Sequence, residues 1–189
     1  MSSKIKILVI GDFHIPFRAD RIPDPLIRFP KEQKVDLIAI TGDLVQDYVL
    51  EPFKEWPLKV IKGNMDMGLV EKYPEKVILE LPGINYKILL FHGSGIYPRG
   101  DLNHLRRITL KNNCKVLLTG HTHVPVAKKI KDVIIINPGS GTGVYGGGGG
   151  LGIPTWAYIT LDREIISVVI YAIKSSQVFT YIQRTFIVK

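Results

Sequence analysis

The sequence predicts a mixed α/β sandwich, and three features lead to this fold class. Apolar, β-branched runs alternate with short helical or loop segments in the first half of the chain, whereas the last part is almost entirely strand-like. The chain has 189 residues, of which 46% are hydrophobic and 22% charged, so it can bury one sizeable core. We therefore expect a single domain over residues 1–189, with strands and helices packed in layers.

The first half is predicted to alternate strands with short helices. Lys4–Ile10 is the first strand. Ala19–Lys34 contains several prolines, so any helix there is short or broken. Leu102–Leu110 has apolar residues at helical spacing, and Asp101 can cap its first turn. The other expected elements are strands at Val35–Thr41, Lys59–Ile61, Lys76–Leu81 and Tyr86–Phe91, and a short helix at Tyr48–Glu55.

The second half is predicted to consist mostly of strands. They are expected at Lys115–Leu118, Val133–Ile136, Trp156–Leu161, Ile165–Tyr171 and Val178–Val188. The third and fourth of these form a hairpin that turns at Asp162-Arg163. Gly146–Gly150 is expected to be a loop, because consecutive glycines lose too much conformational entropy to be held in a helix or strand.

The charge and cysteine content limit the possible partners. A net charge of +8 permits a nucleic-acid or nucleotide partner without requiring one. The densest basic cluster is Lys128, Lys129 and Lys131. We interpret it as a solvated surface, with a phosphate-bearing substrate as the alternative. Cys114 is the single cysteine, which excludes an internal disulfide, and we expect it to be buried.

No segment reads as a signal peptide or a membrane span. Ile5–Ile10 is too short for a signal peptide and contains Lys6. Ile165–Ile173 is about half of the ~20 residues that a membrane-spanning helix needs. We therefore expect a cytoplasmic protein with no membrane partner, and a homo-oligomer is possible.

Five apolar runs are followed by glycine-flanked motifs that carry side chains able to bind metal. Loops at strand ends are where a rigid sheet displays its functional groups. Two residues at i and i+2 in an extended segment point the same way, so both can reach one ion. The candidate ligands are Asp12, His14, Asp43, Asn64, His92, His121 and His123. Together they predict a metal centre along one edge of a sheet.

The donor types indicate two divalent cations. Asp43 stands alone after its strand, as a carboxylate shared between two ions would. Asn64 offers a neutral amide oxygen, and the remaining candidates are carboxylate or imidazole ligands. Nitrogen and oxygen donors without a thiolate suit Mn, Fe, Co, Ni or Zn, of which we favour Mn.

Charge points to a phosphodiester substrate. Two divalent cations and two aspartates leave the site at about +2, which a bridging hydroxide and a phosphodiester monoanion would neutralise. Two ions ~3.5–4 Å apart can activate water and stabilise the phosphoryl oxygens. We predict a phosphodiesterase that uses a metal-activated bridging hydroxide, with Asp43, Asn64 and His92 as catalytic residues. A small-molecule or nucleotide-derived phosphodiester is the favoured substrate, and a nucleic acid is possible but less favoured.

The motif set resembles the calcineurin-like metallophosphoesterase family, from Ile5 to about Tyr158. The matching motifs are Gly-Asp-x-His at 11–14, Gly-Asp at 42–43, Gly-Asn-x-Asp at 63–66, His-Gly at 92–93 and Gly-His-Thr-His at 120–123. Asn137-Pro138-Gly139-Ser140 is similar to the small prokaryotic phosphodiesterase branch. Residues 12–16, 97–101 and 122–123 resemble the subgroup that contains vacuolar protein sorting 29, a subunit of the eukaryotic retromer.

The resemblance implies a four-layer αββα sandwich, in which two mixed β-sheets are flanked by helices. It also implies how the ligands are shared between the ions. One ion would be held by Asp12, His14, Asp43 and His123, and the other by Asp43, Asn64, His92 and His121. A second function is compatible with the same family, namely a protein-interaction scaffold similar to the retromer subunit that retains metal binding.

The chain departs from the family pattern or leaves a role open at five positions. Many members have a histidine where this chain has Met65, which cannot donate a proton, so a general acid must lie elsewhere or be absent. Asp66 either orients a ligand imidazole or lies on a surface turn. Arg18 and Arg99 flank motif loops and either contact phosphate or lie on the surface. His104, on the expected helix, is interpreted as a surface residue.

Overall fold

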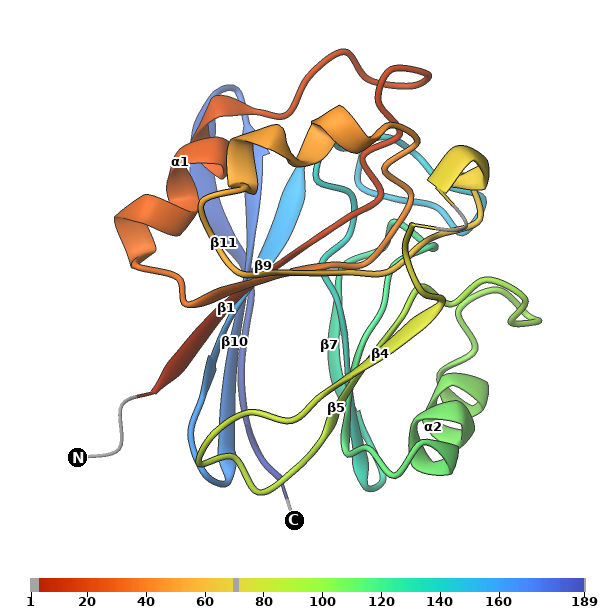
Figure 1. Ribbon diagram of the computed structural model, residues 1–189, viewed down its shortest axis with the longest axis vertical. Coiled ribbons are helices and arrows are strands. Elements are labelled where there is room, and N and C mark those ends of the chain that lie inside the picture. Colours follow the sequence, from red (N-terminus) through yellow and green to blue (C-terminus); the bar gives the residue numbers. More distant parts are fainter. Residues whose placement is uncertain (1–3, 70–71, 189) are drawn as a thin grey trace.

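Two mixed β-sheets form the middle of the protein (Figure 1). The computed structural model describes residues 4–69 and 72–188. The first sheet has the strand order β11-β10-β9-β1-β2-β3 and the second has the order β4-β5-β6-β8-β7. The first comprises β1 (Ile5–Ile10), β2 (Leu37–Ile40), β3 (Leu58–Val60), β9 (Thr155–Leu161), β10 (Ile165–Lys174) and β11 (Gln177–Ile187). The second comprises β4 (Lys76–Leu79), β5 (Ile88–Phe91), β6 (Val116–Leu118), β7 (Val126–Ile130) and β8 (Val133–Asn137).

Helices cover the outer faces of both sheets (Figure 1). The helical elements are α1 (Asp24–Gln33), α2 (Leu102–Lys111) and the 3₁₀ helices η1 (Asp47–Phe53) and η2 (Met67–Leu69). The Asp101 side chain accepts a hydrogen bond from the backbone N–H of His104 and so caps α2, as the sequence predicts. Within the described residues, no helix is long and apolar enough to cross a membrane.

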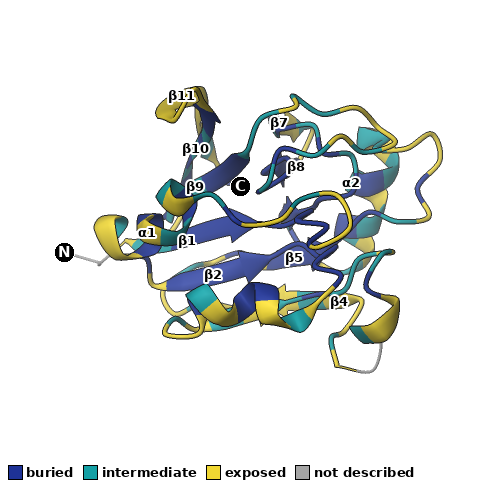
Figure 2. Ribbon diagram, turned by 90° about the horizontal axis from the view of Figure 1, so that it is seen from above, coloured by how far each residue is buried: buried dark blue, intermediate teal, exposed yellow. Residues whose placement is uncertain are grey.

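Three clusters of buried side chains correspond to the interfaces between the layers. The largest lies between the sheets and includes Val9, Leu90 and Val168. A second joins the first sheet to α1 and η1 and includes Leu26, Phe53 and Trp156. A third joins the second sheet to α2. Figure 2 shows the sheets as mostly buried and the helices as buried on one side only. The predicted four-layer αββα sandwich is confirmed.

Parallel pairing positions the loops that matter for function. In the first sheet β1 pairs in parallel with β2, and β2 with β3. In the second sheet β5 pairs in parallel with β6, and β6 with β8. The carboxyl ends of parallel strands meet at one edge of a sheet, where ligands usually bind. The loops after β1, β2 and β3 therefore face those after β5 and β6.

The structure differs from the sequence-based expectation in two elements. Strand β7 was not predicted, because consecutive exposed lysines, Lys128 and Lys129, hide its pattern at the edge of a sheet. The element expected as a helix at Tyr48–Glu55 is the 3₁₀ helix η1, which contains Pro52. Helix α1 is short, as expected, and it tolerates Pro25 because the first turn needs no N–H donor there.

Candidate metal centre

The seven candidate ligands lie on loops that follow five strands from both sheets. The first sheet contributes four of them: Asp12, His14, Asp43 and Asn64 follow β1, β2 and β3. The second sheet contributes the other three: His92, His121 and His123 follow β5 and β6. The side chains of Asp12, His14, Asp43, His92 and His123 are at most 3% exposed, so these groups have left bulk water.

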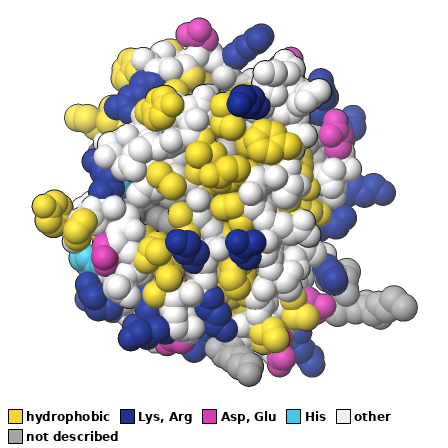
Figure 3. All heavy atoms as spheres, turned by 180° about the vertical axis from the view of Figure 1, so that it is seen from behind, with side chains coloured by type: hydrophobic (Ala, Val, Ile, Leu, Met, Phe, Trp, Pro, Cys, Tyr) yellow, Lys and Arg dark blue, Asp and Glu magenta, His cyan; other side chains and the backbone are white. Residues whose placement is uncertain are grey.

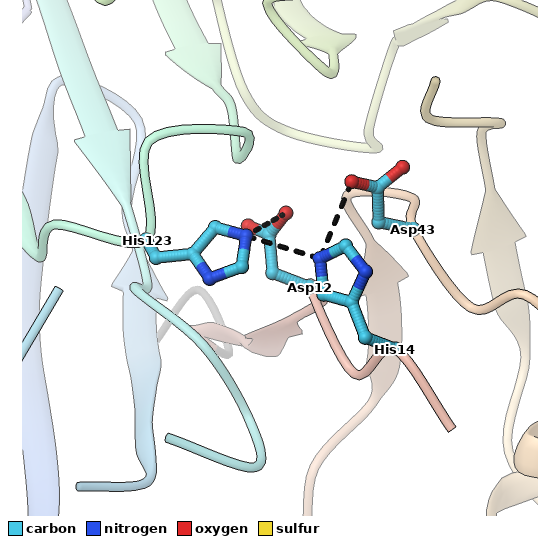
Figure 4. A group of neighbouring side chains, drawn as sticks. All are labelled: Asp12, His14, Asp43 and His123. Carbon is cyan, nitrogen blue, oxygen red and sulfur yellow. Dashed lines mark hydrogen bonds and ion pairs between the residues drawn. The ribbon is translucent and has the colours of Figure 1, made fainter. Parts of the chain in front are cut away.

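One cluster of four side chains lies between the ends of the two sheets (Figure 4). One potential ligand atom from each of Asp12, His14, Asp43 and His123 lies within 4.8 Å of the others. The Nε2 atoms of His14 and His123 are 3.1 Å apart. The His123 Nε2 atom lies 3.4 Å from Asp12 Oδ1. All four side chains thus direct a nitrogen or oxygen atom toward one small volume.

A second cluster adjoins the first and consists of Asp43, His92 and His121. The His92 Nε2 atom lies 3.3 Å from the Asn64 side-chain oxygen, so Asn64 extends this cluster. Asn64 is the most exposed of the candidate ligands and lies at the opening to solvent. The division into two clusters matches the sharing of ligands that the family resemblance implies.

Asp43 connects the two clusters through a single oxygen atom. Its Oδ2 lies 3.4 Å from His14 Nε2 in the first cluster and 3.3 Å from His92 Nε2 in the second. Its other oxygen, Oδ1, accepts a 2.8 Å hydrogen bond from the backbone N–H of Met65. The Met65 backbone therefore fixes the rotation of the carboxylate, and Oδ2 faces both clusters.

Five candidate ligands have left-handed backbone conformations. Their φ angles are +50° at Asp12, +53° at His14, +55° at Asp43, +67° at His121 and +61° at His123. Holding a residue other than glycine in this conformation costs roughly 1–3 kcal/mol of conformational energy, and such residues concentrate at functional sites. The fold thus holds these residues in unfavourable conformations that turn their side chains toward a shared point.

The glycines that precede the ligands leave room for close approach. A Cβ at Gly63 would collide with the Asp43 carboxylate, and one at Gly120 would lie 2.7 Å from Asp12 Oδ2. Both Cβ–oxygen distances would be shorter than a nonbonded carbon–oxygen contact allows. Glycine is therefore required here by space, and the Gly-x pattern in the motifs has a steric cause.

Backbone carbonyls orient two of the imidazoles. His92 Nδ1 lies 2.7 Å from the Thr41 carbonyl oxygen, and His123 Nδ1 lies 2.7 Å from that of Val144. A carbonyl can only accept, so Nδ1 donates a proton to it in both rings, and Nε2 is the atom that faces the clusters. His14 Nδ1 is buried and has no hydrogen-bond partner among the described residues.

Asp66 has a role that neither sequence-based alternative anticipated. Its side chain is fully buried and accepts hydrogen bonds from the backbone N–H groups of Asp43 at 2.8 Å, Gly63 at 2.7 Å and Val45 at 2.7 Å. It touches no imidazole through these bonds and does not lie on the surface. Asp66 holds together the loops that carry Asp43 and Asn64.

Asn137 and Ser140 are further positioning residues, which the sequence analysis assigned only to a family motif. The Asn137 amide donates to the Gly120 carbonyl at 2.7 Å and to Thr122 Oγ1 at 3.1 Å. Ser140 Oγ donates to the Asp12 carbonyl at 2.7 Å. These bonds fix the backbone next to two ligand pairs. The Asn-Pro-Gly-Ser motif was the one feature of the sequence that could have pointed to these two residues.

The pKa values of the buried groups reflect their crowding. Burial, opposed by the charge on His92, raises the pKa of Asp12 to about 7. Burial lowers the pKa values of His14 and His121 to about 4. Burial would raise the pKa of Asp43 and lower that of His92, but their mutual hydrogen bond and charges bring them to about 2 and about 9.

These groups fit divalent cations. At neutral pH, His14 and His121 are neutral and Asp43 is ionised, and the candidate ligand atoms face one another at 3.1–3.4 Å. The Nε2 atoms of His14 and His123 lie 3.1 Å apart, so one cation could bind both of them once neither carries a proton. The mixed nitrogen and oxygen set, free of thiolate, suits transition metals.

Comparisons with known proteins agree with this geometry. Over 135 residues the chain is 36% identical to a probable metallophosphoesterase of Methanothermobacter thermautotrophicus, covering 71% of this chain and 76% of the relative. The crystal structure of vacuolar protein sorting 29 from Entamoeba histolytica complexed with zinc has a TM-score of 0.84 and 26% identity, with 95% and 99% of the two chains covered.

A second similar structure is that of an archaeal phosphodiesterase, with a TM-score of 0.60 and 23% identity over 88% of this chain and 99% of the other. At that identity the likeness concerns the fold. The family model of the calcineurin-like phosphoesterase superfamily domain matches residues 5–163. The match contains all seven candidate ligands, and the chain belongs to the calcineurin-like phosphoesterase superfamily.

Proposed function

We propose that this protein is a dinuclear metal-dependent phosphodiesterase. The observation that carries the proposal is the position of Asp43 Oδ2, which lies 3.4 Å from one imidazole and 3.3 Å from another in two adjoining clusters. A carboxylate oxygen shared by two donor sets is what a pair of ions requires. The ions would be held by Asp12, His14, Asp43 and His123, and by Asp43, Asn64, His92 and His121.

The bound cations would polarise the phosphoryl oxygens and acidify a water molecule for in-line attack. The chain's own residues supply orientation. The Met65 N–H holds Asp43, and the Thr41 carbonyl keeps the His92 Nδ1 proton away from the site. Asn64 is the exposed candidate ligand, so its amide would meet an incoming phosphate first. Manganese is our first choice of metal, and zinc is an alternative supported by the zinc complex of the E. histolytica protein.

Two cavities that meet at Asn64 favour a diester over a monoester. One, of about 210 Å³, is lined by five of the seven candidate ligands together with Arg18, Arg99 and Gly147. The other, of about 430 Å³, is lined by Lys62, Met67, Ser94 and neighbouring residues. A phosphate at Asn64 would have space on both sides for an organic group. A monoester would occupy only one of them.

The test uses bis(p-nitrophenyl) phosphate and p-nitrophenyl phosphate with protein reconstituted with Mn²⁺. We expect faster hydrolysis of the diester, loss of activity with a chelator and recovery when Mn²⁺ is restored. Asp43→Ala should abolish activity, because both ions lose a ligand. His104→Ala is the control, because this residue lies on α2, outside the two clusters, and its rate should equal that of the wild type. Equal rates for the two variants would contradict the assignment.

A scaffold that retains metal is the second candidate. The observation in its favour is edge strand β11, which leaves Val178, Phe179, Tyr181 and Ile187 at least 40% exposed. Figure 3 shows hydrophobic side chains gathered on the side of the molecule where β11 and β7 lie (Figure 2). Exposed apolar surface on a strand edge is a site for protein contact. Protein that binds two ions and turns over no phosphoester would support this candidate over the hydrolase.

A further inference from the structure

Two arginines border the candidate metal centre. Arg18 and Arg99 line the cavity of about 210 Å³ that contains His14, Asp43 and Asn64. Among the lining residues, Asp43 is the one carboxylate and the two arginines are the fixed cations. Neither guanidinium forms an ion pair with a carboxylate in the part of the chain that the structure describes. Both arginines are exposed to solvent and are therefore available to an anion in the cavity.

Arg18 is held at the cavity by two contacts. Its backbone N–H donates to the His14 carbonyl at 2.9 Å, which places it one turn beyond a candidate ligand. Its Nη1 donates to the Tyr145 carbonyl at 3.3 Å. Arginine has five N–H donors, so most remain available after this bond. The hydrogen bond holds the side chain in place, and its other N–H groups can still bind a ligand.

Arg99 reaches the same cavity from the loop between β5 and α2. Its guanidinium packs against Gly147, where a Cβ would lie 2.8 Å from Cζ and Nη1. The neighbouring Gly146 packs against the His123 ring, where a Cβ would lie 2.6 Å from Cδ2. The absence of side chains at both glycines lets this segment lie directly over a candidate ligand and a guanidinium. Gly146 thus has a steric reason to be glycine, whereas a side chain at Gly147 would displace the end of Arg99.

The charges exceed what one phosphodiester needs. Two divalent cations with two aspartates leave about +2, which a hydroxide and one phosphodiester monoanion already neutralise. Arg18 and Arg99 add two more positive charges beside that point. Guanidinium groups bind phosphate with two parallel hydrogen bonds, and they do so best when no protein carboxylate competes.

We infer that Arg18 and Arg99 form a second anion-binding subsite, which selects phosphodiesters that carry a further phosphate on the group lying under the Tyr145–Gly147 segment. The inference rests on the proposed phosphodiesterase function, whose scissile phosphate the metal centre would hold. Terminally phosphorylated dinucleotides have this chemistry. The cavity on the other side of Asn64, lined by Lys62 and Met67, would take the remaining group.

A binding experiment tests the subsite without turnover. Thymidine 3′,5′-bisphosphate and thymidine 5′-monophosphate are titrated into Mn²⁺-loaded protein by calorimetry. We expect the bisphosphate to bind at least ten times more tightly. Arg18→Met and Arg99→Met should each remove most of this ratio, and Arg99→Lys should restore part of it. Arg107→Met, an exposed arginine on α2, is the matched control and should keep the full ratio. Manganese content is measured for every variant, so that lost metal is not mistaken for a lost subsite.

A kinetic arm separates this inference from the function on which it rests. The dinucleotides TpT and pTpT differ only by the terminal phosphate, and KM should be at least ten times lower for pTpT. Hydrolysis of TpT with no preference for pTpT would overturn the subsite and leave the phosphodiesterase intact. Tighter binding of the bisphosphate with no hydrolysis of either dinucleotide would support the subsite and contradict the phosphodiesterase. Equal affinity for the two thymidine nucleotides would overturn the subsite outright.

Discussion

The Asp66 Oδ1 atom accepts a 2.7 Å hydrogen bond from the backbone N–H of Val45, a residue with a φ angle of +75°. A β-branched residue in this conformation is a genuine outlier. Val45 lies two positions after Asp43, and Asp66 Oδ2 accepts from Asp43 and Gly63. One buried carboxylate thus compensates the strain next to the shared ligand.

Asp66→Asn tests this compensation. An amide has one oxygen where the carboxylate has two, so at least one of the three N–H groups loses its acceptor. We expect a loss of roughly 1–3 kcal/mol in the free energy of unfolding. We also expect metal affinity to fall 10–100-fold, because Asp43 is no longer fixed. Urea denaturation and metal titration measure the two effects. The exposed Asp20→Asn is the control, and equal effects in the two variants would rule out this role for Asp66.

Metal stoichiometry distinguishes the two clusters. Asp12 belongs to one cluster, whereas Asp43 belongs to both. We therefore expect Asp12→Asn to bind one of two Mn²⁺ ions and Asp43→Asn to bind neither tightly. Elemental analysis after dialysis gives the count. Retention of both ions by Asp43→Asn would show that its carboxylate is not shared.

The pH dependence of stability in metal-free protein follows from His92. Its pKa is raised to about 9 in the folded protein, from 6.5, through its hydrogen bond to Asp43 and the charge of Asp12, which outweigh burial. Between pH 7 and 9 the folded state keeps a proton that the unfolded state has lost, so the free energy of unfolding falls as pH rises. Each unit of pKa difference corresponds to about 1.4 kcal/mol.

Urea denaturation at pH 7, 8 and 9 in the presence of a chelator measures this slope. His92→Gln should remove most of it, because glutamine does not titrate. Wild-type stability that rises from pH 7 to 9 would contradict the raised pKa of His92. Below pH 7 the slope is mixed. As pH rises from the ordinary pKa of Asp12 to about 7, the contribution of Asp12 to the free energy of unfolding falls. As pH rises from about 4 to 6.5, the contribution of His14 rises.

Removing metal should lower thermal stability. The ions would join loops from both sheets, and they bind only where those loops are folded. Saturation at one hundred times the dissociation constant contributes about 2.7 kcal/mol for one site. We expect the midpoint of thermal unfolding to rise with Mn²⁺ concentration in the wild type and to stay constant in Asp43→Asn. A midpoint that does not respond in the wild type would exclude metal binding to the folded state.

Met65→His should add the proton donor that family resemblance leads one to expect at this position. Met65 lines the cavity with the candidate ligands, and its backbone N–H, rather than its side chain, contacts Asp43. We expect at least a tenfold rise in kcat for diesters with alkyl leaving groups and little change for p-nitrophenyl esters, which leave without a proton. Met65→Gln, which has a similar length but is no general acid, is the control. An equal rise for both classes of ester would argue against acid catalysis.

Residue types alone revealed the candidate ligands, because each follows an apolar run that ends a strand. The convergence of these strand ends was readable from the same pattern, since parallel strands share an edge. Asp66 could not be assigned. Its three partners are backbone N–H groups on two loops, and a sequence carries no information on which amides lack an acceptor. The positive φ angles of the candidate ligands could not be predicted either, because the sequence does not distinguish a histidine or aspartate in the left-handed conformation from one in an ordinary conformation.

Strand β7 shows a different limit. Strands are recognised in a sequence by the pattern of buried apolar residues. Strand β7 lies at an edge, has two consecutive lysines and buries only one of its residues, so this pattern is weak. The shared position of Arg18 and Arg99 could not be predicted from the sequence either. Both were exposed residues beside motif loops, and only the folded chain shows that two such loops open onto one cavity.

The largest apolar cluster fills the space between the sheets, whereas the candidate metal ligands occupy only the rim where the strands end. The main apolar core therefore contains none of the candidate ligands. A related chain could exchange those few polar side chains and still keep the apolar layer that joins its two sheets. Chemistry and architecture can evolve separately here, because they draw on different parts of the chain.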